Sequence, residues 1–534
     1  MGTRGDERAA GGWPHGTRED SVIGWGTASH LVLAALIGAW GLVVSLAMDR
    51  LTRPSGATLR RPVPAIAIHA GLFLGAWCLL WLLGGRPGFA AALTLAGQFL
   101  VIAVSNAKFR ALREPFLFSD FGLFSQVFRF PRLYLPFFGV ARAVGVAIGT
   151  GVAVAVGLLL EGPWPGGRAL AAALLPCGPL LLMTGTRLSA PPRLDPLQDL
   201  RSIGLFPSLW LYWLAELRTV PLVPPRPWLD QPLGRSATDR PPDLVLVQSE
   251  SFFDVRRLYP GVRPELLSRF DALRRQALMH GLLSVSAWGA NTMRTEFAVL
   301  SGIGDDALGV HRFNPYRRFA RRDILTLPHR LRALGYETVC IHPYPIGFFG
   351  RDRVFPNLGF DRFIDIDDFP NAPRDGPYVA DAAVTRKIAE VLGAADGPTF
   401  VFAITMENHG PLHLERVSPA EMAGLYLEPP QAGWDDLAVY LRHIANADRM
   451  FGDLAELVAE RPRGGVLCLF GDHVPSMPRV YEDRGYCDPR TDYVVWPAVS
   501  APRGRVDLDA YQLPEVLLAA LAGVGQPATD TDQR

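Results

Sequence analysis

"LVLVQSESFFD", residues 244–254, is the stretch that places the second half of the chain in a fold class. Its first four residues are apolar without interruption, and they lead through a glutamine and a serine to Glu250. A continuous apolar strand is typical of a parallel sheet that is covered on both faces. In such sheets ligands bind beyond the carboxyl ends of the strands. The stretch therefore predicts a buried parallel strand with Glu250 at a functional position.

Similar apolar runs alternate with helical patterns throughout the second half of the chain. The expected strands are Asp243–Gln248, Gly281–Ser286, Glu337–His342, Thr399–Thr405, Gly465–Phe470 and Tyr493–Ala498. The expected helices are Pro264–Ala277, Met293–Leu300, Leu325–Leu334, Ala382–Leu392, Leu441–Ala459 and Pro514–Leu521. This alternation predicts an α/β sandwich with a mostly parallel central sheet.

Two more apolar runs end in groups that can carry chemistry. "FVFAITMENHGP" (400–411) ends in His409, and "VLCLFGDHVP" (466–475) ends in Asp472 and His473. Such groups are costly beyond buried strands unless they are paired, hydrogen-bonded or bound to a metal. Taken singly, the adjacent aspartate and histidine could form a turn, and the other histidine could be an ordinary loop residue.

Together with Glu250 at one sheet edge, these groups predict a divalent metal site. Glu250 alone could instead cap a helix. Carboxylate and imidazole ligands suit Mn²⁺ or Zn²⁺, whereas Mg²⁺ prefers more oxygen ligands.

"WGANTMRTEF", residues 288–297, delivers Thr292 to the start of an expected helix. The threonine could cap this helix through its side chain. It could also be a nucleophile, since a helix N-terminus attracts anions and a neighbouring metal would lower the pKa of the hydroxyl. The predicted metal ligands at the same sheet edge favour the nucleophile role for Thr292, with helix capping as a possible second role.

Composition divides the chain into four parts. The 534 residues are 49% hydrophobic and 20% charged, with a net charge of +1. Such a balance gives no support for nucleic-acid binding, which usually needs a basic surface. We expect a multi-span helical membrane domain over 1–205, a juxtamembrane helix and proline-rich linker over 206–242, the α/β domain over 243–525 and a flexible tail over 526–534.

The first part has the composition of a membrane domain. Between residues 21 and 194 the acidic residues are Asp49, Glu114, Asp120 and Glu161. Crossing a bilayer takes roughly 20 apolar residues. We expect about five spans, two of them short enough to be re-entrant instead, at Leu31–Met48, Val63–Leu83, Phe89–Val104, Ala143–Leu160 and Ala169–Met183.

The charges leave the orientation of these spans open. Basic residues crowd the first and third loops, which the positive-inside rule places in the cytoplasm. With five spans the α/β domain would then lie inside as well. A further membrane-embedded element at Ile203–Leu217 would reverse this, or that stretch could lie in the interface.

Four stretches in order, "QSESFFD", "GANTMRTEF", "ENHGP" and "FGDHVP", resemble the motifs of the alkaline phosphatase superfamily. The likeness is to the lipoteichoic acid synthase and phosphoglycerol transferase family in particular. The membrane part and "REPFLFSDFGLFSQ" (113–126) are similar too, so the likeness covers most of the chain. The motifs are specific together, whereas any one alone would be weak.

The resemblance implies roles for individual residues. Glu250, Asp472 and His473 would bind one divalent metal, Mn²⁺ first and Mg²⁺ or Zn²⁺ as alternatives. Thr292 would be both a metal ligand and the nucleophile. His409 would contact the phosphate or assist proton transfer.

The stretch "IHPYPIGFFGRD" (341–352) matches the part of the family that faces the phosphoglycerol head group. The resemblance implies substrate contacts for His342 and Arg351, although Arg351 alone could be a plain surface charge. Phe349 stands where a tryptophan is common, which is a departure from the family pattern at a substrate-binding position.

The resemblance also implies a two-step transfer at the bacterial inner membrane. Thr292 would attack a phospholipid donor such as phosphatidylglycerol and release diacylglycerol. A hydroxyl of a glycan or glycerophosphate polymer, or water, would then resolve the phospho-threonine. Membrane spans raise the effective concentration of the catalytic domain near a lipid donor. Since this family handles its substrates outside the cytoplasmic membrane, we expect a multi-pass protein with a periplasmic catalytic domain.

Other functions are compatible with parts of the pattern. A sulfatase needs Cys or Ser in a Cys/Ser-x-Pro-x-Arg context, which the chain lacks after Thr292. A phosphoethanolamine transferase also uses threonine but usually carries many disulfides, and the soluble part has only Cys340, Cys468 and Cys487. A related phosphodiesterase would use water as acceptor. A non-catalytic membrane regulatory protein would not need the intact set of metal ligands.

Overall fold

The structure is a computed structural model that describes residues 19–54, 60–123, 126, 129–131, 133, 139–230, 240–319, 324–497 and 504–523. For residues 19–28, 140, 142 and 143 it describes the backbone alone. The tail expected at 526–534 lies outside the described residues, as does part of the expected linker, 231–239. Two compact units are present, the first formed by Met1–Ile102, Val146–Ala190 and Ser202–Pro207, the second by Ala103–Gly145, Pro191–Arg201 and Ser208–Arg534.

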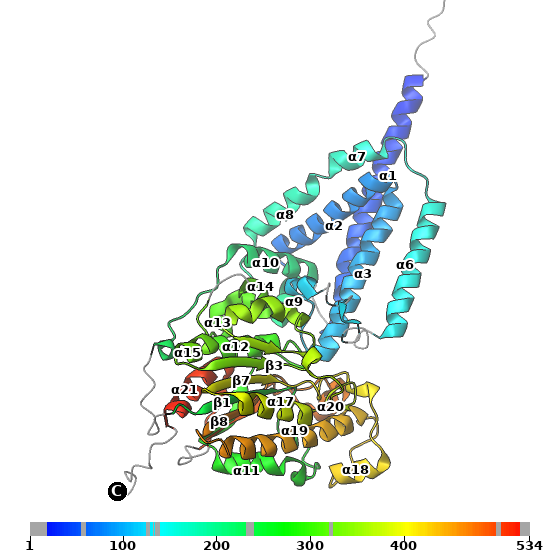
Figure 1. Ribbon diagram of the computed structural model, residues 1–534. Coiled ribbons are helices and arrows are strands. Elements are labelled where there is room, and N and C mark those ends of the chain that lie inside the picture. The colour runs from blue at the N-terminus through cyan, green and yellow to red at the C-terminus, as the bar shows by residue number, and fades with distance from the viewer. Residues whose placement is uncertain are drawn as a thin grey trace, which may run out of the picture. The chain divides into compact units, whose positions relative to one another are not determined.

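The first unit consists of apolar helices (Figure 1). The helices that lie wholly or partly in it include α1 (Glu19–Met48), α2 (Val63–Gly84), α3 (Pro87–Leu112), α6 (Val140–Leu160), α7 (Gly167–Leu174) and α8 (Cys177–Leu188). Among the described residues, the stretches that are long and apolar enough to cross a membrane are Ser29–Leu51, Val63–Gly84, Pro87–Leu112 and Gly167–Leu188. The apolar stretch of α6, Val144–Leu160, is shorter.

Glycines allow α2 and α8 to pack closely. A Cβ atom at Gly71 would lie 2.7 Å from the carbonyl oxygen of Gly178, and one at Gly185 would lie 2.7 Å from that of Pro64. Small residues at helix contacts let apolar helices approach one another in lipid, where no hydrophobic force drives them together.

The second unit is built on an eight-stranded sheet with the order β10-β2-β9-β8-β1-β7-β3-β4. The strands are β1 (Asp243–Ser249), β2 (Met279–Ser284), β3 (Glu337–Ile341), β4 (Arg362–Ile364), β7 (Thr399–Ile404), β8 (Gly465–Gly471), β9 (Thr491–Pro497) and β10 (Leu508–Asp509). β9 is antiparallel to β8 and β2, and the other neighbouring pairs are parallel. The predicted α/β sandwich with a mostly parallel sheet is confirmed.

Helices cover both faces of this sheet (Figure 1). One layer contains α11 (Ser268–Gln276), α17 (Asp381–Ala394) and α19 (Asp435–Ala459), and the other contains α12 (Met293–Ser301), α15 (Leu327–Ala333) and α21 (Leu513–Gly523). Alternate residues of β1 therefore enter different cores. Val245 and Val247 pack with the first layer, while Leu244 and Leu246 pack with the second.

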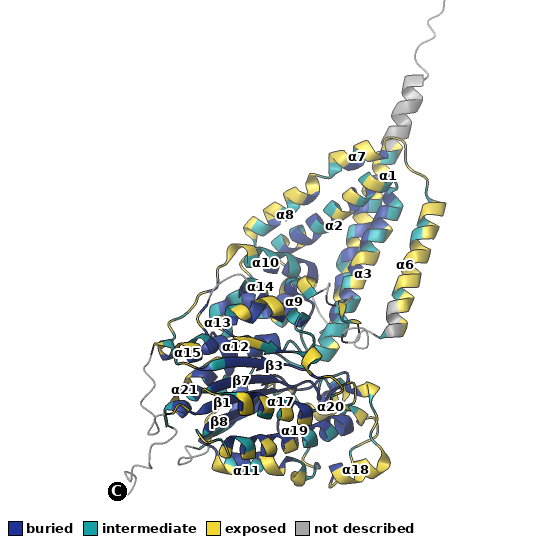
Figure 2. Ribbon diagram, viewed as in Figure 1, coloured by how far each residue is buried: buried dark blue, intermediate teal, exposed yellow. Residues whose placement is uncertain are grey.

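This two-sided burial explains why the first four residues of the opening stretch are all apolar. Every residue of β1, β7 and β8 is buried, as Figure 2 shows by their dark colour. Each expected strand and helix of the second unit is present with shifted ends, and α19 begins earlier than expected, at Asp435. β4 and β10 were not predicted, because two or three residues are too short to show a strand period.

The remaining described elements are short or connect the larger ones. They include α9 (Pro196–Ile203), α10 (Leu205–Arg218), α13 (Asp305–Leu308), α14 (Pro315–Phe319), α16 (Arg351–Val354), α18 (Pro419–Leu425), α20 (Pro478–Arg484) and the hairpin of β5 (Arg374–Asp375) and β6 (Tyr378–Val379). The last part of α3 and the segment that follows it, together Ala103–Gly145, belong by their contacts to the same unit as the sheet.

Candidate active site

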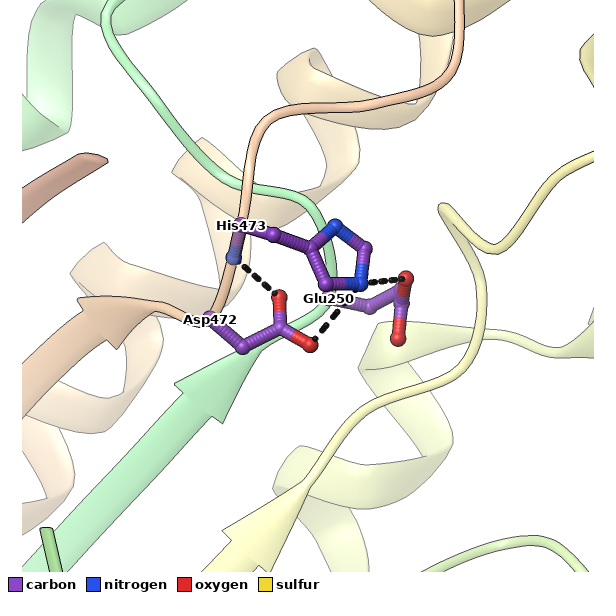
Figure 3. Close-up of side chains that lie close together, drawn as sticks. All are labelled: Glu250, Asp472 and His473. Carbon is purple, nitrogen blue, oxygen red and sulfur yellow. Dashed lines mark hydrogen bonds and ion pairs between the residues drawn. The ribbon is translucent and has the colours of Figure 1, made fainter. Parts of the chain in front are cut away.

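Three predicted metal ligands meet where β1 and β8 end (Figure 3). Glu250 follows β1, Asp472 and His473 follow β8, and one ligand atom from each lies within 4.8 Å of the other two. The Nε2 atom of His473 is 3.2 Å from Oδ2 of Asp472 and 3.6 Å from Oε1 of Glu250. All three side chains are buried. Adjacent parallel strands bring their carboxyl ends to one edge, and this places the groups together.

The hydrogen bond of His473 to Val474 shows which ring nitrogen could bind a metal. Nδ1 lies 3.1 Å from the carbonyl oxygen of Val474, which can only accept, so Nδ1 carries the proton. Nε2 faces the two carboxylates (Figure 3). Metal-bound histidines use this arrangement, in which the second nitrogen donates to a carbonyl.

Only one carboxylate oxygen of Asp472 accepts hydrogen bonds from the protein. Its Oδ1 accepts the backbone N–H groups of Ser251, at 2.9 Å, and His473, at 3.0 Å. Its Oδ2 is buried and has no hydrogen-bond donor. Two buried carboxylates that face each other are costly unless a cation lies beside them, and the imidazole nitrogen between them can bind such a cation. The residues present therefore fit a divalent metal.

The electrostatics of Glu250 support this fit. Burial and the neighbouring Asp472 raise the pKa of Glu250 to about 8. Without a cation the second carboxylate would thus be held protonated near neutral pH. A bound divalent ion would supply positive charge that keeps both carboxylates ionised, polarises a phosphoryl oxygen and lowers the pKa of a nearby hydroxyl.

Thr292 lies beside this group, at the N-terminus of α12. Its Oγ1 is 3.5 Å from Nε2 of His473, and its side chain is buried. The side chain makes no capping hydrogen bond, so the capping role expected for Thr292 is wrong. Asn291 and Gly289 have φ values of 68° and 70°, which form the sharp turn that presents the threonine. The hydroxyl is therefore oriented by the site rather than by the helix end.

His409 lies on the loop after β7, the other neighbour of β1. Asn408 connects this loop to the site by donating to the carbonyl oxygen of Glu250 at 3.2 Å. The Nδ1 of His409 is 2.6 Å from the carbonyl oxygen of Gly410 and therefore donates to it. Burial lowers the pKa of His409 below its usual value. The imidazole is neutral at pH 7 and leaves Nε2 as a proton acceptor.

His342 and Arg351 contact each other, with 3.3 Å between Nε2 and Nη1. Both are buried, and burial together with Arg351 keeps the pKa of His342 well below its usual value. Arg351 is no surface charge, because its other nitrogens donate to Glu296 at 2.8 and 3.2 Å. Phe349, with φ of 55°, places its ring centroid 5.4 Å from the guanidinium. Sequence reasoning missed Glu296, a charged residue on an otherwise apolar face of α12.

A second group of acid and imidazole side chains lies in the same unit. Asp375, Glu407 and His443 also place one ligand atom each within 4.8 Å of one another. Here, however, both imidazole nitrogens face carboxylates, Nδ1 at 3.1 Å from Glu407 and Nε2 at 3.2 Å from Glu415. The group is a protonated histidine between two acids, unlike the arrangement around His473.

The loop "REPF" is bonded to the helix of Thr292. Glu114 accepts two hydrogen bonds from Arg294, both at 2.9 Å, and one from Lys108 at 2.8 Å. Burial works to raise the pKa of Glu114, but the two cations lower it to about 2. A residue from the segment after α3 thus fixes α12 two positions beyond Thr292.

The fold and the site define an enzyme of the sulfatase family, within the alkaline phosphatase superfamily, that carries apolar helices long enough to span a membrane. The Sulfatase family model matches residues 242–509, and the chain belongs to this family.

Individual relatives extend the likeness beyond the sheet. The chain is 30% identical over 506 residues to the capsular polysaccharide biosynthesis protein RkpI of Rhizobium meliloti, covering 87% of this chain and 86% of the relative. It is 30% identical over 257 residues to a R. meliloti protein named for cyclic beta-1,2-glucan modification, covering 48% of this chain and 39% of that protein. In fold it is similar to the lipooligosaccharide phosphoethanolamine transferase A of Neisseria meningitidis, with a TM-score of 0.54, 14% identity, and coverage of 91% and 95%.

Proposed function

We propose that this protein transfers a phosphoglycerol group from phosphatidylglycerol to a hydroxyl of an envelope glycan, through a phospho-threonine at Thr292. Its catalytic unit would lie on the periplasmic side of the bacterial inner membrane. Glu250, Asp472 and His473 would bind one divalent ion, Mn²⁺ in the first place, with Thr292 completing the set. His342, Arg351, Phe349 and His409 would receive the donor head group.

The observation that carries this proposal is the environment of the Thr292 hydroxyl. Oγ1 is buried, makes no capping bond, and lies 3.5 Å from Nε2 of His473. A threonine is a weak nucleophile unless its pKa is lowered by a neighbouring base or metal. The N-terminus of α12 adds backbone N–H groups that favour the negative charge of a phosphoryl group.

The reaction balances in two displacements at phosphorus. Oγ1 of Thr292 bonds to the phosphorus of the lipid, the bond to the diacylglycerol oxygen breaks, and diacylglycerol gains the proton that Thr292 loses. An acceptor hydroxyl then bonds to the same phosphorus and the bond to Thr292 breaks. The neutral His409 accepts the proton of the acceptor hydroxyl, and this proton passes on to the departing oxygen of Thr292, so that both side chains return to their starting states.

The choice of a glycan acceptor is supported by the relatives. RkpI is named for capsular polysaccharide biosynthesis, and the second relative is named for modification of a cyclic glucan. Both names concern polysaccharides, although the second relative is matched over 39% of its own length. The five cysteines of this chain, all among the described residues, are free, and this supports a phosphoglycerol over a phosphoethanolamine transferase with its usual disulfides.

A trapping experiment tests the proposal. The full-length protein is incubated with phosphatidylglycerol or phosphatidylethanolamine labelled in the phosphate, then denatured and mapped for phosphorylated residues. We expect label on Thr292 from phosphatidylglycerol and none in Thr292→Ala. Thr326→Ala is the matched control, because Thr326 is a buried threonine at the N-cap of α15 and should leave labelling unchanged.

The other outcomes are equally decisive. Label only from phosphatidylethanolamine would replace the proposed head group. No label from either lipid in the metal-loaded protein would contradict the transferase itself.

A further inference from the structure

A cavity of about 280 Å³ opens beside the turn that presents Thr292, within the second unit. Its wall comes from three segments that are distant in sequence, together with Pro489. They contribute residues 112–114, residues 195–197, and residues 285–288 with Asn291 and Arg294. The turn itself is bonded to the metal-ligand loop, because the N–H of Gly289 donates to the carbonyl oxygen of Val474 at 3.0 Å. The cavity and the nucleophile therefore share one structural element.

Arg113 lines this cavity, and its guanidinium has no acidic partner among the described residues. Its guanidinium lies 4.1 Å from the ring centroid of Trp288 and 5.5 Å from that of Tyr481. Among the described residues this guanidinium has no ion pair and no hydrogen bond, although it is half-buried. Its backbone has φ of 50°, a conformation that non-glycine residues adopt rarely. Five N–H donors are thus held at the wall of the cavity without protein acceptors.

Asn291 adds a second uncommitted group. Its side-chain amide also lines the cavity and makes no hydrogen bond to the described part of the chain. It is adjacent in sequence to Thr292, so a ligand that it binds lies close to the nucleophile. Leu112, Leu197 and Pro196 supply apolar wall between these polar groups.

The charges of the wall distinguish a sugar from a lipid phosphate. Arg113 and Arg294 are balanced by Glu114 and Asp195, which line the same cavity. A cavity without net positive charge does not favour an anionic phosphate, whereas hydroxyl groups bind to amide, guanidinium and carboxylate groups alike. Sugar rings also carry apolar C–H faces that pack on aromatic and aliphatic side chains. The volume lies at the small end of ligand sites, which suits one or two rings.

We propose that this cavity binds a neutral sugar unit of the acceptor glycan and directs one of its hydroxyls toward phosphorylated Thr292. The inference rests on the proposed transfer, and it assigns Arg113, Asn291 and Trp288 to the acceptor. The donor head group would then be bound on the side of His342 and Arg351. Separate subsites let the acceptor enter while the phosphoryl group stays on the threonine.

Separating the two half-reactions in the full-length protein tests this assignment. The first readout is phospho-threonine formation from phosphatidylglycerol without acceptor, and the second is transfer to a neutral β-linked glucose trisaccharide at varied concentration. Arg113→Ala should leave the first rate and the donor KM within about twofold, and raise the KM for the trisaccharide at least tenfold, about 1.4 kcal/mol. Leu197→Trp, which fills the cavity, should act in the same way.

Arg484→Ala is the matched control, since Arg484 lies over Tyr259 at 5.8 Å and outside the cavity. Titration calorimetry with the trisaccharide, and separately with glycerol 3-phosphate, gives a readout that needs no turnover. Binding of the trisaccharide that Arg113→Ala abolishes would support the sugar site even if no phospho-threonine forms. A raised KM for the donor, binding of glycerol 3-phosphate that depends on Arg113, or an unchanged trisaccharide KM would overturn the inference.

Discussion

Glu296 and Arg351 form an ion pair that is buried on both sides, with 2.8 Å between Oε2 and Nη2 and side-chain exposures of 0% and 1%. Glu296 also accepts a hydrogen bond from the hydroxyl of Tyr316, and its Oε2 lies 3.5 Å from the amide of Gln248 on β1. The carboxylate thus connects the helix of Thr292, the first strand and the start of α16, where Arg351 lies. It positions the guanidinium whose free edge contacts His342.

Removing this carboxylate should destabilise the protein strongly. Glu296→Ala leaves Arg351 buried and unpaired, and breaking one side of a buried pair costs about 3–5 kcal/mol. Thermal unfolding of the full-length protein, followed by tryptophan fluorescence, measures the loss. Glu337→Ala is the control, because Glu337 and Arg362 form a 2.9 Å pair that is 38% and 54% exposed. Such surface pairs contribute about 0–1 kcal/mol, so equal melting temperatures of the two variants would show that the buried pair stabilises the protein no more than a surface pair does.

The strands, and the meeting of Glu250, Asp472 and His473 at one edge of the sheet, could be predicted because both follow from local pattern. The roles of the three as metal ligands came from the family resemblance and stay a prediction. An apolar run such as Leu244–Val247 is long enough to mark a strand that is buried on both faces. Parallel neighbours then bring Glu250 and Asp472 to the same edge whatever the loops do. The topological rule alone is enough for this placement, without the geometry of any loop.

The ion pairs that support the site could not be predicted from the sequence, because they do not follow from local pattern. Glu296 and Arg351 are 55 residues apart, and Glu114 and Arg294 are 180 apart. Neither pair shares a strand, a helix face or a period, so the pairing depends on how loops cross one another. The side chain of Thr292 misled in a different way, since the N-cap position is occupied but the capping bond is absent.

Metal binding should stabilise the protein through Glu250, Asp472 and His473. Adding Mn²⁺ to metal-stripped full-length protein should raise its melting temperature, and an ion at 100 times its Kd contributes about 2.7 kcal/mol. Zn²⁺ should act at lower concentration than Mg²⁺, because one ligand is an imidazole. Asp472→Asn removes a ligand charge and should abolish the shift.

Asp448→Asn separates this effect from general loss of stability. Asp448 is a buried aspartate that accepts the backbone N–H groups of Arg269 and Phe270 at the start of α11. This variant should melt lower than the wild type yet keep the full shift on adding Mn²⁺. A shift that survives in Asp472→Asn would exclude this triad as the binding site.

The stability of the second unit should depend on pH through His443. Burial works to lower the pKa of this imidazole, but hydrogen bonds to Glu407 and Glu415 raise it to about 9. The folded protein therefore keeps the proton up to about pH 9, whereas an unfolded histidine loses it near pH 6.5. The stabilisation is complete below pH 6.5 and is lost as the pH rises through 9, a change on the order of 3 kcal/mol.

Melting temperatures of the full-length protein between pH 6 and 10 measure this loss. The melting temperature of the wild type should fall steadily above pH 6.5. That of His443→Gln, which cannot gain the proton, should be lower at pH 6 and should fall less over the same range. His413→Gln changes an exposed histidine in the same region, and its melting temperature should depend on pH as that of the wild type does. Parallel profiles for wild type and His443→Gln would show that the proton on His443 does not stabilise the fold.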